Sequence, residues 1–133
     1  MTYDVEKLID FALAAKSNSY SPYSNFKVGA AILLKNGKYI LGTNIENKSY
    51  SMTVCAERCA LFKLISDGYT KDDVVAMCVT ANSSEICTPC GACREVMAEL
   101  LNPDCDVVLT NNIRERMIVK VSDLLPLAFK LEK

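Results

Sequence analysis

Residues 55–57 read CAE and residues 89–93 read PCGAC, and these two short segments carry the most informative pattern in the chain. Between them they supply three cysteines, Cys55, Cys90 and Cys93. Three protein ligands leave the fourth tetrahedral position of a zinc ion open for water, which distinguishes a catalytic zinc site from a structural one. The carboxylate of Glu57, two residues after the first cysteine, can lie beside that water without coordinating the metal. The pattern therefore predicts a metal and a proton carrier side by side.

Both segments stand where helices are expected to begin, and each is followed by an arginine. The partial positive charge of a helix N-terminus stabilises a thiolate over a thiol, so two such ends can support three anionic sulfurs. Zinc bound by three thiolates carries excess negative charge, which weakens it as a Lewis acid unless neighbouring groups offset that charge. Arg58 and Arg94 directly follow the two motifs, and we expect them to donate hydrogen bonds to sulfur. The alternative is that each is a solvated surface arginine.

Two other uses of these cysteines remain open on spacing alone. Cys59 lies four residues after Cys55 on the same helical face. A site made of these two residues with Cys90 and Cys93 would be a closed structural zinc with no position for water. Such a site gives Glu57 no function, and structural zinc ions usually stabilise small modules that lack a core. A C-x-x-C segment also marks thiol–disulfide enzymes, but that function leaves Cys55 and Glu57 unexplained.

Length and charge exclude several classes of protein. A chain of 133 residues predicts one domain, residues 1–133, with room for a single core. Its 15 basic and 16 acidic residues give a net charge of −1, whereas nucleic-acid binders usually carry a clustered basic excess. The first residues lack the pattern of a signal peptide, and no apolar run approaches the roughly 20 residues that span a bilayer. We therefore expect no nucleic-acid partner and no membrane.

The counts of cysteine and histidine bear on compartment and mechanism. Seven cysteines are an odd number, and together with the C-x-x-C and no export signal they favour metal binding over disulfides. We therefore predict a cytoplasmic protein, because the cytosol keeps thiols reduced. The chain contains no histidine, so proton transfer must use Glu, Asp, Lys, Cys or a metal-bound water.

Apolar periodicity predicts an α/β fold. Helices are expected over residues 5–16, from Cys55 to a stop at Gly68, and from Cys90 to about Asn102. Strands are predicted at residues 26–34, 39–43, 74–80, 107–109 and 117–119, with a tight turn at 36–37, a loop at 44–53 and a short turn at 124–126. This order predicts a mixed five-stranded sheet with helices packed against it.

Four segments, in this order, resemble the cytidine deaminase family of the small homotetrameric type, and the resemblance runs nearly the whole length. The first is SPYSNFKVGAA at residues 21–31, and the second is NIEN at 44–47 with SYS at 49–51. The third comprises the two cysteine motifs with their arginines, a zinc pattern typical of nucleobase deaminases. The fourth is LLP at 124–126 with Phe129. The resemblance implies a three-layer fold with helices on both faces of the sheet.

The same resemblance implies the chemistry of the metal site. It places one zinc ion per subunit on Cys55, Cys90 and Cys93, with Glu57 as the proton shuttle. The implied reaction is hydrolytic deamination of free cytidine and 2′-deoxycytidine to uridine and 2′-deoxyuridine with release of ammonia, in pyrimidine salvage. The alternatives are a deaminase of a nucleoside-like antibiotic and a non-catalytic, zinc-stabilised binding module.

A nucleoside site is also implied by the resemblance. The side chains of Asn44 and Glu46 would hold the ribose hydroxyls, and Phe26 would flank the nucleoside. The backbone of Ala56 would contact the pyrimidine. Phe129 would pack on the base and reach the site of a neighbouring subunit, in a homotetramer with shared active sites. Ordinary core packing is the alternative for the two phenylalanines.

Two positions depart from the usual residues of that family. Cys59 stands where Thr is common, and Glu95 stands where Gln is usual. A further thiol and a further carboxylate near an anionic metal can alter metal affinity or sensitivity to oxidation. Neither change removes a group that the implied chemistry needs.

Overall fold

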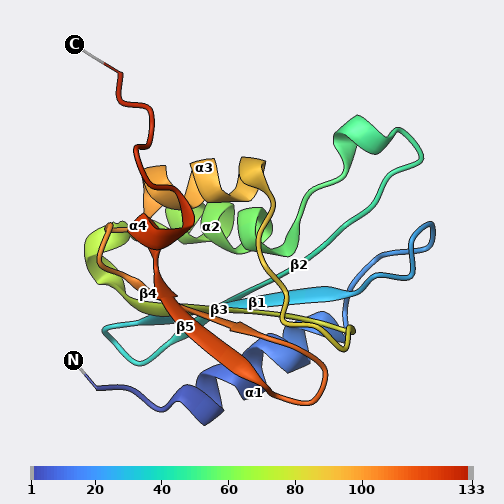
Figure 1. The fold of residues 1–133 in the computed structure, drawn as a ribbon, viewed down its shortest axis with the longest axis horizontal. Coiled ribbons are helices and arrows are strands. Elements are labelled where there is room, and N and C mark those ends of the chain that lie inside the picture. The colour runs from blue at the N-terminus through green and yellow to red at the C-terminus, as the bar shows by residue number, and fades with distance from the viewer. Residues whose placement is uncertain (1, 132–133) are drawn as a thin grey trace.

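A five-stranded sheet forms the middle of the molecule, with helices on both faces (Figure 1). The computed structural model describes residues 2–131. In chain order the elements are α1 (Val5–Lys16), β1 (Val28–Leu34), β2 (Tyr39–Thr43), the 3₁₀ turn η1 (Tyr50–Met52), α2 (Ala56–Ser66), the 3₁₀ turn η2 (Lys71–Asp73), β3 (Val74–Ala81), α3 (Gly91–Leu100), β4 (Asp106–Thr110), β5 (Arg116–Lys120) and α4 (Val121–Leu124). The predicted α/β fold, with its mixed sheet between helices, is confirmed. None of the helices within residues 2–131 is long and apolar enough to cross a membrane.

The strands lie in the order β2-β1-β3-β4-β5. Strand β1 runs antiparallel to both β2 and β3, and β4 runs antiparallel to β5. Strands β3 and β4 are parallel, and a parallel pair needs a crossover between its members. Helix α3 supplies that crossover, so the PCGAC segment at its start lies at the end of β3, on the α2 side of the sheet (Figure 1).

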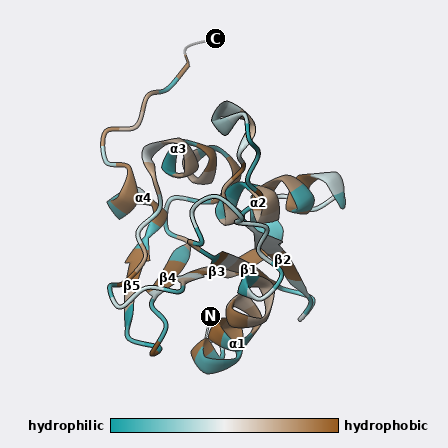
Figure 2. Cartoon of the chain, turned by 90° about the vertical axis from the view of Figure 1, so that its right-hand side faces the viewer, coloured by the Kyte–Doolittle hydropathy of each residue, from teal (hydrophilic) through white to brown (hydrophobic). Residues whose placement is uncertain are grey.

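Strand β1 is buried along its whole length because helices cover both faces of the sheet. Successive side chains of a strand point to opposite faces. Ala31 and Leu33 pack with α1, whereas Ala30, Ile32 and Leu34 pack in the larger core under α2 and α3. Figure 2 shows the sheet between α1 on one side and α2 and α3 on the other. This continuous apolar run is typical of a strand covered on both faces.

Gly42 in β2 allows the first turn of α2 to lie directly on the sheet. A Cβ atom at this position would stand 2.5 Å from the carbonyl oxygen of Ala56 and 2.5 Å from the backbone nitrogen of Ala60. Backbone atoms cannot move aside as a flexible side chain can. Any larger residue would therefore displace the start of α2, which carries Cys55 and Glu57.

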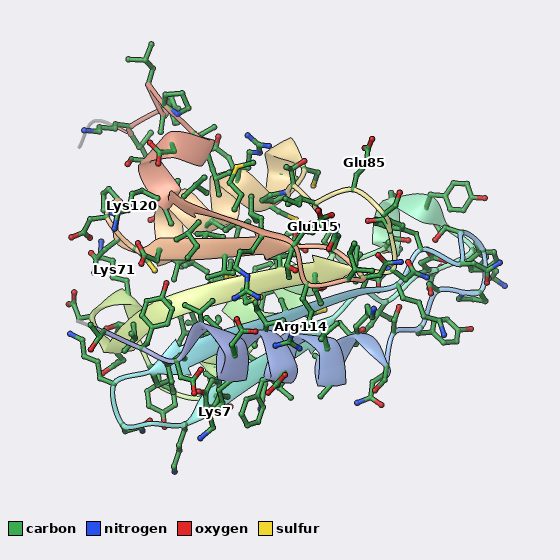
Figure 3. All side chains as sticks on the ribbon, turned by 60° about the horizontal axis from the view of Figure 1, so that its bottom comes forward. Lys7, Lys71, Glu85, Arg114, Glu115 and Lys120 are labelled. Atoms are coloured by element: carbon green, nitrogen blue, oxygen red, sulfur yellow. The ribbon has the colours of Figure 1, made fainter. Side chains whose placement is uncertain are left out.

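The loop between β4 and β5 is tied to α1 by charged side chains. Arg114 places Nη1 2.9 Å from Oδ1 of Asp10 and Nη2 3.0 Å from Oε1 of Glu6, and Arg116 also pairs with Glu6. Hydrogen bonds from Arg116 and Arg114 lower the pKa of Glu6 to about 2. Figure 3 shows Arg114 lying over α1. These contacts hold the β4–β5 edge of the sheet to α1, which lies on the face opposite the cysteine motifs.

Some boundaries differ from the sequence predictions. The first strand begins at Val28 instead of Phe26, because Asn25 has a φ of 57° and interrupts an extended path. The N–H of Lys27 is instead bonded to Oδ1 of Asn82, 2.9 Å away. The predicted loop at 44–53 contains the short turn η1, and a second such turn, η2, precedes β3.

Candidate active site

Three sulfur atoms meet where α2 and α3 begin. The Sγ atoms of Cys55 and Cys90 are 4.0 Å apart, and those of Cys90 and Cys93 are 3.5 Å apart. All three lie within 4.8 Å of one another. Zinc–sulfur bonds of about 2.3 Å in a tetrahedral site place the sulfurs roughly 3.8 Å apart. The spacing of the three sulfurs therefore fits a single zinc ion.

The backbone positions of the cysteines explain this convergence. Cys55 is the N-cap residue of α2, and Cys90 is the N-cap residue of α3, while Cys93 lies in the first turn of α3. Helices α2 and α3 pack beside one another (Figure 1), so their N-terminal ends bring the sulfurs together. Neither N-cap cysteine makes a side-chain capping bond. Their sulfurs are therefore free to bind a metal at helix ends that favour negative charge.

The protonation of the thiols also fits a cation. A hydrogen bond from the Cys93 thiol, together with one from Arg58, lowers the pKa of Cys55 to about 5. The pKa of Cys93 is raised, because its proton bonds to the Cys55 sulfur and because it is buried. Like charges this close cannot all form unless something neutralises them. A divalent metal would allow all three sulfurs to be thiolates.

Glu57 stands in the first turn of α2, where its carboxyl interacts with the sulfurs of Cys55 and Cys93. Its side chain is buried, with 4% of its surface exposed. Burial raises the pKa of Glu57, and the nearby Cys55 sulfur raises it further. A carboxyl group with a raised pKa is a stronger base than an ordinary carboxylate and can accept and then return a proton. This is the behaviour required of a proton shuttle next to a metal-activated water.

The two arginines that follow the motifs lie differently. Nη2 of Arg58 is 3.6 Å from Sγ of Cys55, and Nε of Arg58 is buried with no hydrogen-bond partner among residues 2–131. Arg94 differs from the sequence prediction, because its guanidinium binds two backbone carbonyls and no sulfur in the described chain. Its positive charge still lies near the start of α3. Arg58 contacts a sulfur whereas Arg94 contacts backbone carbonyls, which indicates that the two arginines have different functions.

Cys59 lies outside the sulfur cluster. Within the described part of the chain, the group of close metal-binding side chains holds Cys55, Cys90 and Cys93 and no fourth cysteine. The half-buried Cys59 instead lines a separate cavity of about 280 Å³ with Leu41 among its walls. The geometry therefore favours an open three-cysteine site over a closed four-cysteine one.

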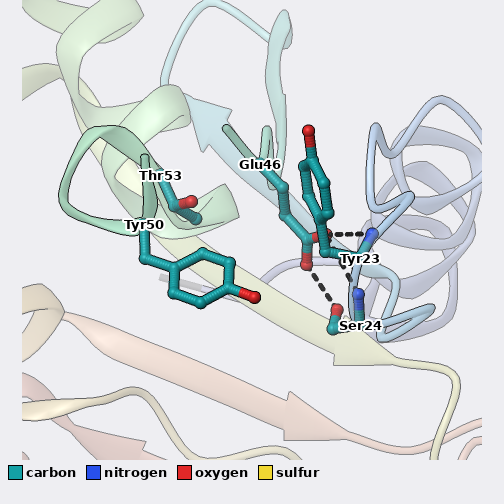
Figure 4. Close-up of a pocket in the computed structure, with 5 residues that line it drawn as sticks. All are labelled: Tyr23, Ser24, Glu46, Tyr50 and Thr53. Carbon is teal, nitrogen blue, oxygen red and sulfur yellow. Dashed lines mark hydrogen bonds between the residues drawn. The ribbon is translucent and has the colours of Figure 1, made fainter. Parts of the chain in front are cut away.

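A cavity of about 300 Å³ lies beside the loops that precede β1 and α2 (Figure 4). It is lined by Tyr23, Ser24, Glu46, Tyr50 and Thr53. Oε1 of Glu46 accepts hydrogen bonds from the backbone N–H groups of Tyr23 at 2.9 Å and Ser24 at 3.2 Å. The Ser24 hydroxyl also donates to Oε2 of Glu46, and these bonds, led by the Ser24 hydroxyl, lower the pKa of Glu46. The cavity thus holds an ionised carboxylate in a fixed orientation.

Asn44 is buried beside the same loops, and most of its amide is already bonded. Its Oδ1 accepts from the backbone N–H of Val28 at 3.0 Å and from the Ser19 hydroxyl. Its Nδ2 donates to the carbonyl oxygen of Phe26 at 2.7 Å. A side-chain amide has two N–H donors, so Asn44 retains one N–H for a ligand.

Comparison with known proteins now places the chain in a family. Residues 2–109 match the family model described as the cytidine and deoxycytidylate deaminase zinc-binding region. The chain is 50% identical over 129 residues to a cytidine deaminase of Halalkalibacterium halodurans, covering 97% of this chain and 96% of that protein. The chain belongs to the cytidine and deoxycytidylate deaminase family. It is also 47% identical over 129 residues to a cytidine deaminase of Sporosarcina psychrophila, covering 97% and 93% of the two chains.

Solved structures of the deaminase family share the fold. The crystal structure of cytidine deaminase from Burkholderia pseudomallei matches with a TM-score of 0.92 and 45% identity, covering 96% of this chain and 100% of that one. The family resemblance predicted from the sequence is thus confirmed. The family model is a zinc-binding region and the three-cysteine cluster fits that ion, so the cofactor of this deaminase-family chain is zinc.

The remaining positions expected to contact substrate are placed as follows. Ala56 is buried as the first residue of α2. Phe26 is 44% exposed and Phe129 is 77% exposed, so neither phenylalanine packs into the core of this chain. Sequence reasoning did not single out Ser24, whose contact with Glu46 spans 22 residues along the chain. Its only signal was membership of the SPYSNF segment that resembles the deaminase family.

Proposed function

We propose that this protein is a zinc-dependent deaminase of free cytidine and 2′-deoxycytidine, producing the uridine nucleosides and ammonia. In this proposal Cys55, Cys90 and Cys93 bind the metal, and Glu57 carries the protons. The observation that carries the proposal is the buried Glu57 carboxyl beside three converging sulfurs at two helix N-termini. A closed structural site would need a fourth ligand, and a binding module would not need the buried acid.

The chemistry divides between the metal and the chain. Bound zinc lowers the pKa of a water molecule towards about 7, so that the water becomes a nucleophile at neutral pH. Glu57 accepts the proton of that water and delivers it to N3 of the pyrimidine, which makes C4 electrophilic. The water oxygen adds to C4, and the resulting C4 hydroxyl gives its proton to Glu57. Glu57 passes this second proton to the exocyclic amine, the C4–N bond breaks to release ammonia, and the C4 oxygen becomes the carbonyl of the product. One carboxyl therefore acts first as base and then as acid.

The arrangement of the chain supports a free nucleoside as substrate. The ionised Glu46 retains lone pairs that can accept a ribose hydroxyl, and Asn44 retains one N–H that can donate to one. The balanced charge of the chain argues against a polynucleotide. Relatives named cytidine deaminase at up to 50% identity favour cytidine over an antibiotic of similar shape. Pyrimidine salvage follows as the process that would use such an enzyme.

A homotetramer with shared active sites accounts for the exposed C-terminal segment. Beyond α4 the chain extends away from the rest of the molecule (Figure 1). Leu127, Phe129 and Leu131 are each more than three-quarters exposed on that segment. Apolar side chains gathered in this way favour burial against another surface, and Phe129 could then cover the base in a neighbouring site. Seven free thiols favour the cytosol, where they stay reduced.

Ammonia release by the purified, zinc-loaded protein tests the proposal directly. We expect release from cytidine and from 2′-deoxycytidine, accompanied by the loss of ultraviolet absorbance that marks conversion to uracil. Blasticidin-type antibiotics and single-stranded oligonucleotides serve as competing substrates. Turnover of the antibiotic but not of cytidine would transfer the assignment to the antibiotic class. A folded, zinc-containing protein that deaminates none of these substrates would refute it.

Ser24 is expected to affect substrate binding through Glu46. Replacing Ser24 by Ala removes the hydroxyl that orients Oε2 of the carboxylate, while the two backbone N–H bonds to Oε1 remain. Hydrogen bonds to charged groups contribute about 1.5–3 kcal/mol, part of which Glu46 would regain from water. We expect KM for cytidine to rise roughly three- to tenfold with kcat within about twofold.

Steady-state kinetics check this expectation, with Ser122→Ala as the matched control. Ser122 is exposed on α4, and its hydroxyl has no hydrogen bond within residues 2–131. The control should leave both constants unchanged. A Ser24→Ala variant that lowers kcat at constant KM would show that Ser24 acts on the chemistry instead of on binding.

A further inference from the structure

Arg94 joins two segments that lie far apart in the sequence. Its Nε donates to the carbonyl oxygen of Pro89 at 2.8 Å, and its Nη1 donates to the carbonyl oxygen of Leu124 at 3.0 Å. The guanidinium is half-buried, and both acceptor residues are buried. The planar fork of an arginine suits this geometry, because it presents several N–H donors in fixed directions.

The backbone on both sides of Cys90 is hydrogen-bonded to Arg94, on one side by its side chain and on the other by its main chain. Its side chain binds the carbonyl of Pro89, which belongs to the peptide entering Cys90. Its own backbone N–H binds the carbonyl of Cys90 at 3.0 Å, which belongs to the peptide leaving that residue. The orientations of these two peptides set φ and ψ of Cys90, and hence the direction of its Cα–Cβ bond. The backbone bond is an i→i−4 bond at the start of α3 that any residue at position 94 would make, so the specific contribution of the Arg94 side chain is to orient the peptide that enters Cys90.

Cys90 needs such support more than the other two cysteines do. It is exposed, whereas Cys55 is half-buried and Cys93 is buried. Pro89 has no N–H to offer, and within residues 2–131 its carbonyl has Arg94 as its hydrogen-bond partner. Packing therefore fixes Cys55 and Cys93, but hydrogen bonding from Arg94 fixes Cys90.

The hydrogen bond from Nη1 of Arg94 to Leu124 fixes the start of the C-terminal segment. Leu124 is the last residue of α4, and the final carbonyls of a helix have no partner within it. A guanidinium at this end satisfies one such carbonyl. The segment that carries the exposed Phe129 begins immediately afterwards. A single side chain thus connects the metal-binding loop with the origin of that segment.

We propose that Arg94 is a positioning residue that locks Cys90 against α4, and that it slows the loss of zinc. The proposal rests on the three-cysteine zinc site proposed above. Arg58 contacts the Cys55 sulfur and can act by its positive charge. The proposed function of Arg94 instead requires that one guanidinium bind the carbonyls of Pro89 and Leu124 at the same time. Removing outer partners of metal ligands typically weakens metal binding by 10- to 100-fold.

The test measures zinc transfer to a coloured chelator in excess, which is independent of activity. Arg94→Gln removes both the charge and the fork, whereas Arg94→Lys keeps the charge but cannot bind both carbonyls in the same way. We expect both variants to release zinc roughly tenfold faster or more than the parent protein. Glu99→Gln is the matched control, because Glu99 is exposed on the same helix but farther from the cysteine motif, and it should release zinc at the parental rate.

Amide hydrogen exchange provides the second readout. The N–H groups of Val121, Ser122 and Leu125 bind the carbonyls of Cys105, Pro103 and Val121 respectively, and these bonds hold α4 in place. We expect faster exchange over residues 120–125 in both Arg94 variants and unchanged exchange in β3. If the substitutions only lowered the overall stability of the protein, exchange would be faster throughout the core.

Three results would overturn the proposal. Zinc release at the parental rate in Arg94→Gln would show that the bridge does not hold Cys90. Recovery of the parental rate in Arg94→Lys would show that charge alone is responsible. If exchange became faster in β3 to the same extent as in α4, Arg94 would only stabilise the fold in general. If Arg94→Gln does not fold, Arg94→Lys decides between these accounts. A parent protein that binds no zinc would instead refute the proposed function.

Discussion

Replacing Glu57 by Gln is expected to abolish deamination while zinc stays bound. Glutamine has nearly the same shape as glutamate but cannot exchange a proton. General acid–base catalysis contributes about 10²- to 10⁴-fold to a rate, and here one carboxyl performs both the base step and the acid step. We therefore expect kcat to fall by about 10⁴-fold or more. Because Glu57 is not one of the three converging sulfurs, the zinc content should remain near one ion per chain.

The same substitution should stabilise the folded chain. Burial raises the pKa of Glu57, so the ionised carboxyl is less favourable in the folded than in the unfolded state. A raised carboxyl pKa means that the associated stability is complete below the unfolded pKa and decreases as the pH rises towards the folded one. At neutral pH Glu57 therefore costs stability, and the neutral amide removes that cost. With zinc removed from both proteins, we expect a higher Tm in Glu57→Gln than in the parent protein.

Kinetics and metal analysis of the zinc-loaded proteins, and thermal unfolding of their zinc-free forms, measure these effects. Glu85→Gln is the matched control, because Glu85 is exposed on the loop before α3 (Figure 3). It should leave the rate, the zinc content and the Tm unchanged. Substantial turnover by zinc-loaded Glu57→Gln would show that another group carries the protons, and the proposed mechanism would fail.

Much of the fold could be predicted because its signals are local. The run from Val28 to Leu34 is apolar at almost every position and predicts a strand covered on both faces. Gly68 adopts a φ of 92° directly after α2, as the predicted stop requires. The start of the first strand was wrong because the left-handed backbone of Asn25 and the bond from Lys27 to Asn82 are not encoded in apolar periodicity. A side-chain acceptor from a distant loop binds the N–H of Lys27, so the strand begins at Val28 and not at Phe26.

In the candidate site, too, the features set by short sequence motifs could be predicted, whereas the contacts between distant segments could not. The cysteines could be predicted to converge because each stands at or near a helix start, which short sequence motifs reveal. The partners of Arg94 could not, because Leu124 lies 30 residues further along the chain. Adjacency to Cys93 suggested a contact with sulfur, but the crossover of the chain brought α4 within closer reach. Contacts between separate elements depend on packing that one segment does not specify.

Replacing Cys93 by Ser is expected to remove zinc and activity together. Cys93 is fully buried in the first turn of α3, so no other side chain can readily take its place. A serine hydroxyl is a poor zinc ligand at neutral pH, because the metal requires a deprotonated donor. We expect zinc affinity to fall by more than about 100-fold, beyond the range seen for loss of an outer partner. The Tm should also fall, because the ion that stabilises the folded state is lost.

Cys59→Thr is the matched control, and it separates the open site from the closed one. Cys59 is a cysteine four residues after a ligand, but it lies outside the sulfur cluster of the described chain. Metal analysis and kinetics should therefore find Cys59→Thr close to the parent protein and Cys93→Ser without zinc. Loss of zinc from both variants would establish a four-cysteine site. Such a site would leave no position for the attacking water, and the buried Glu57 would then have no proton to carry.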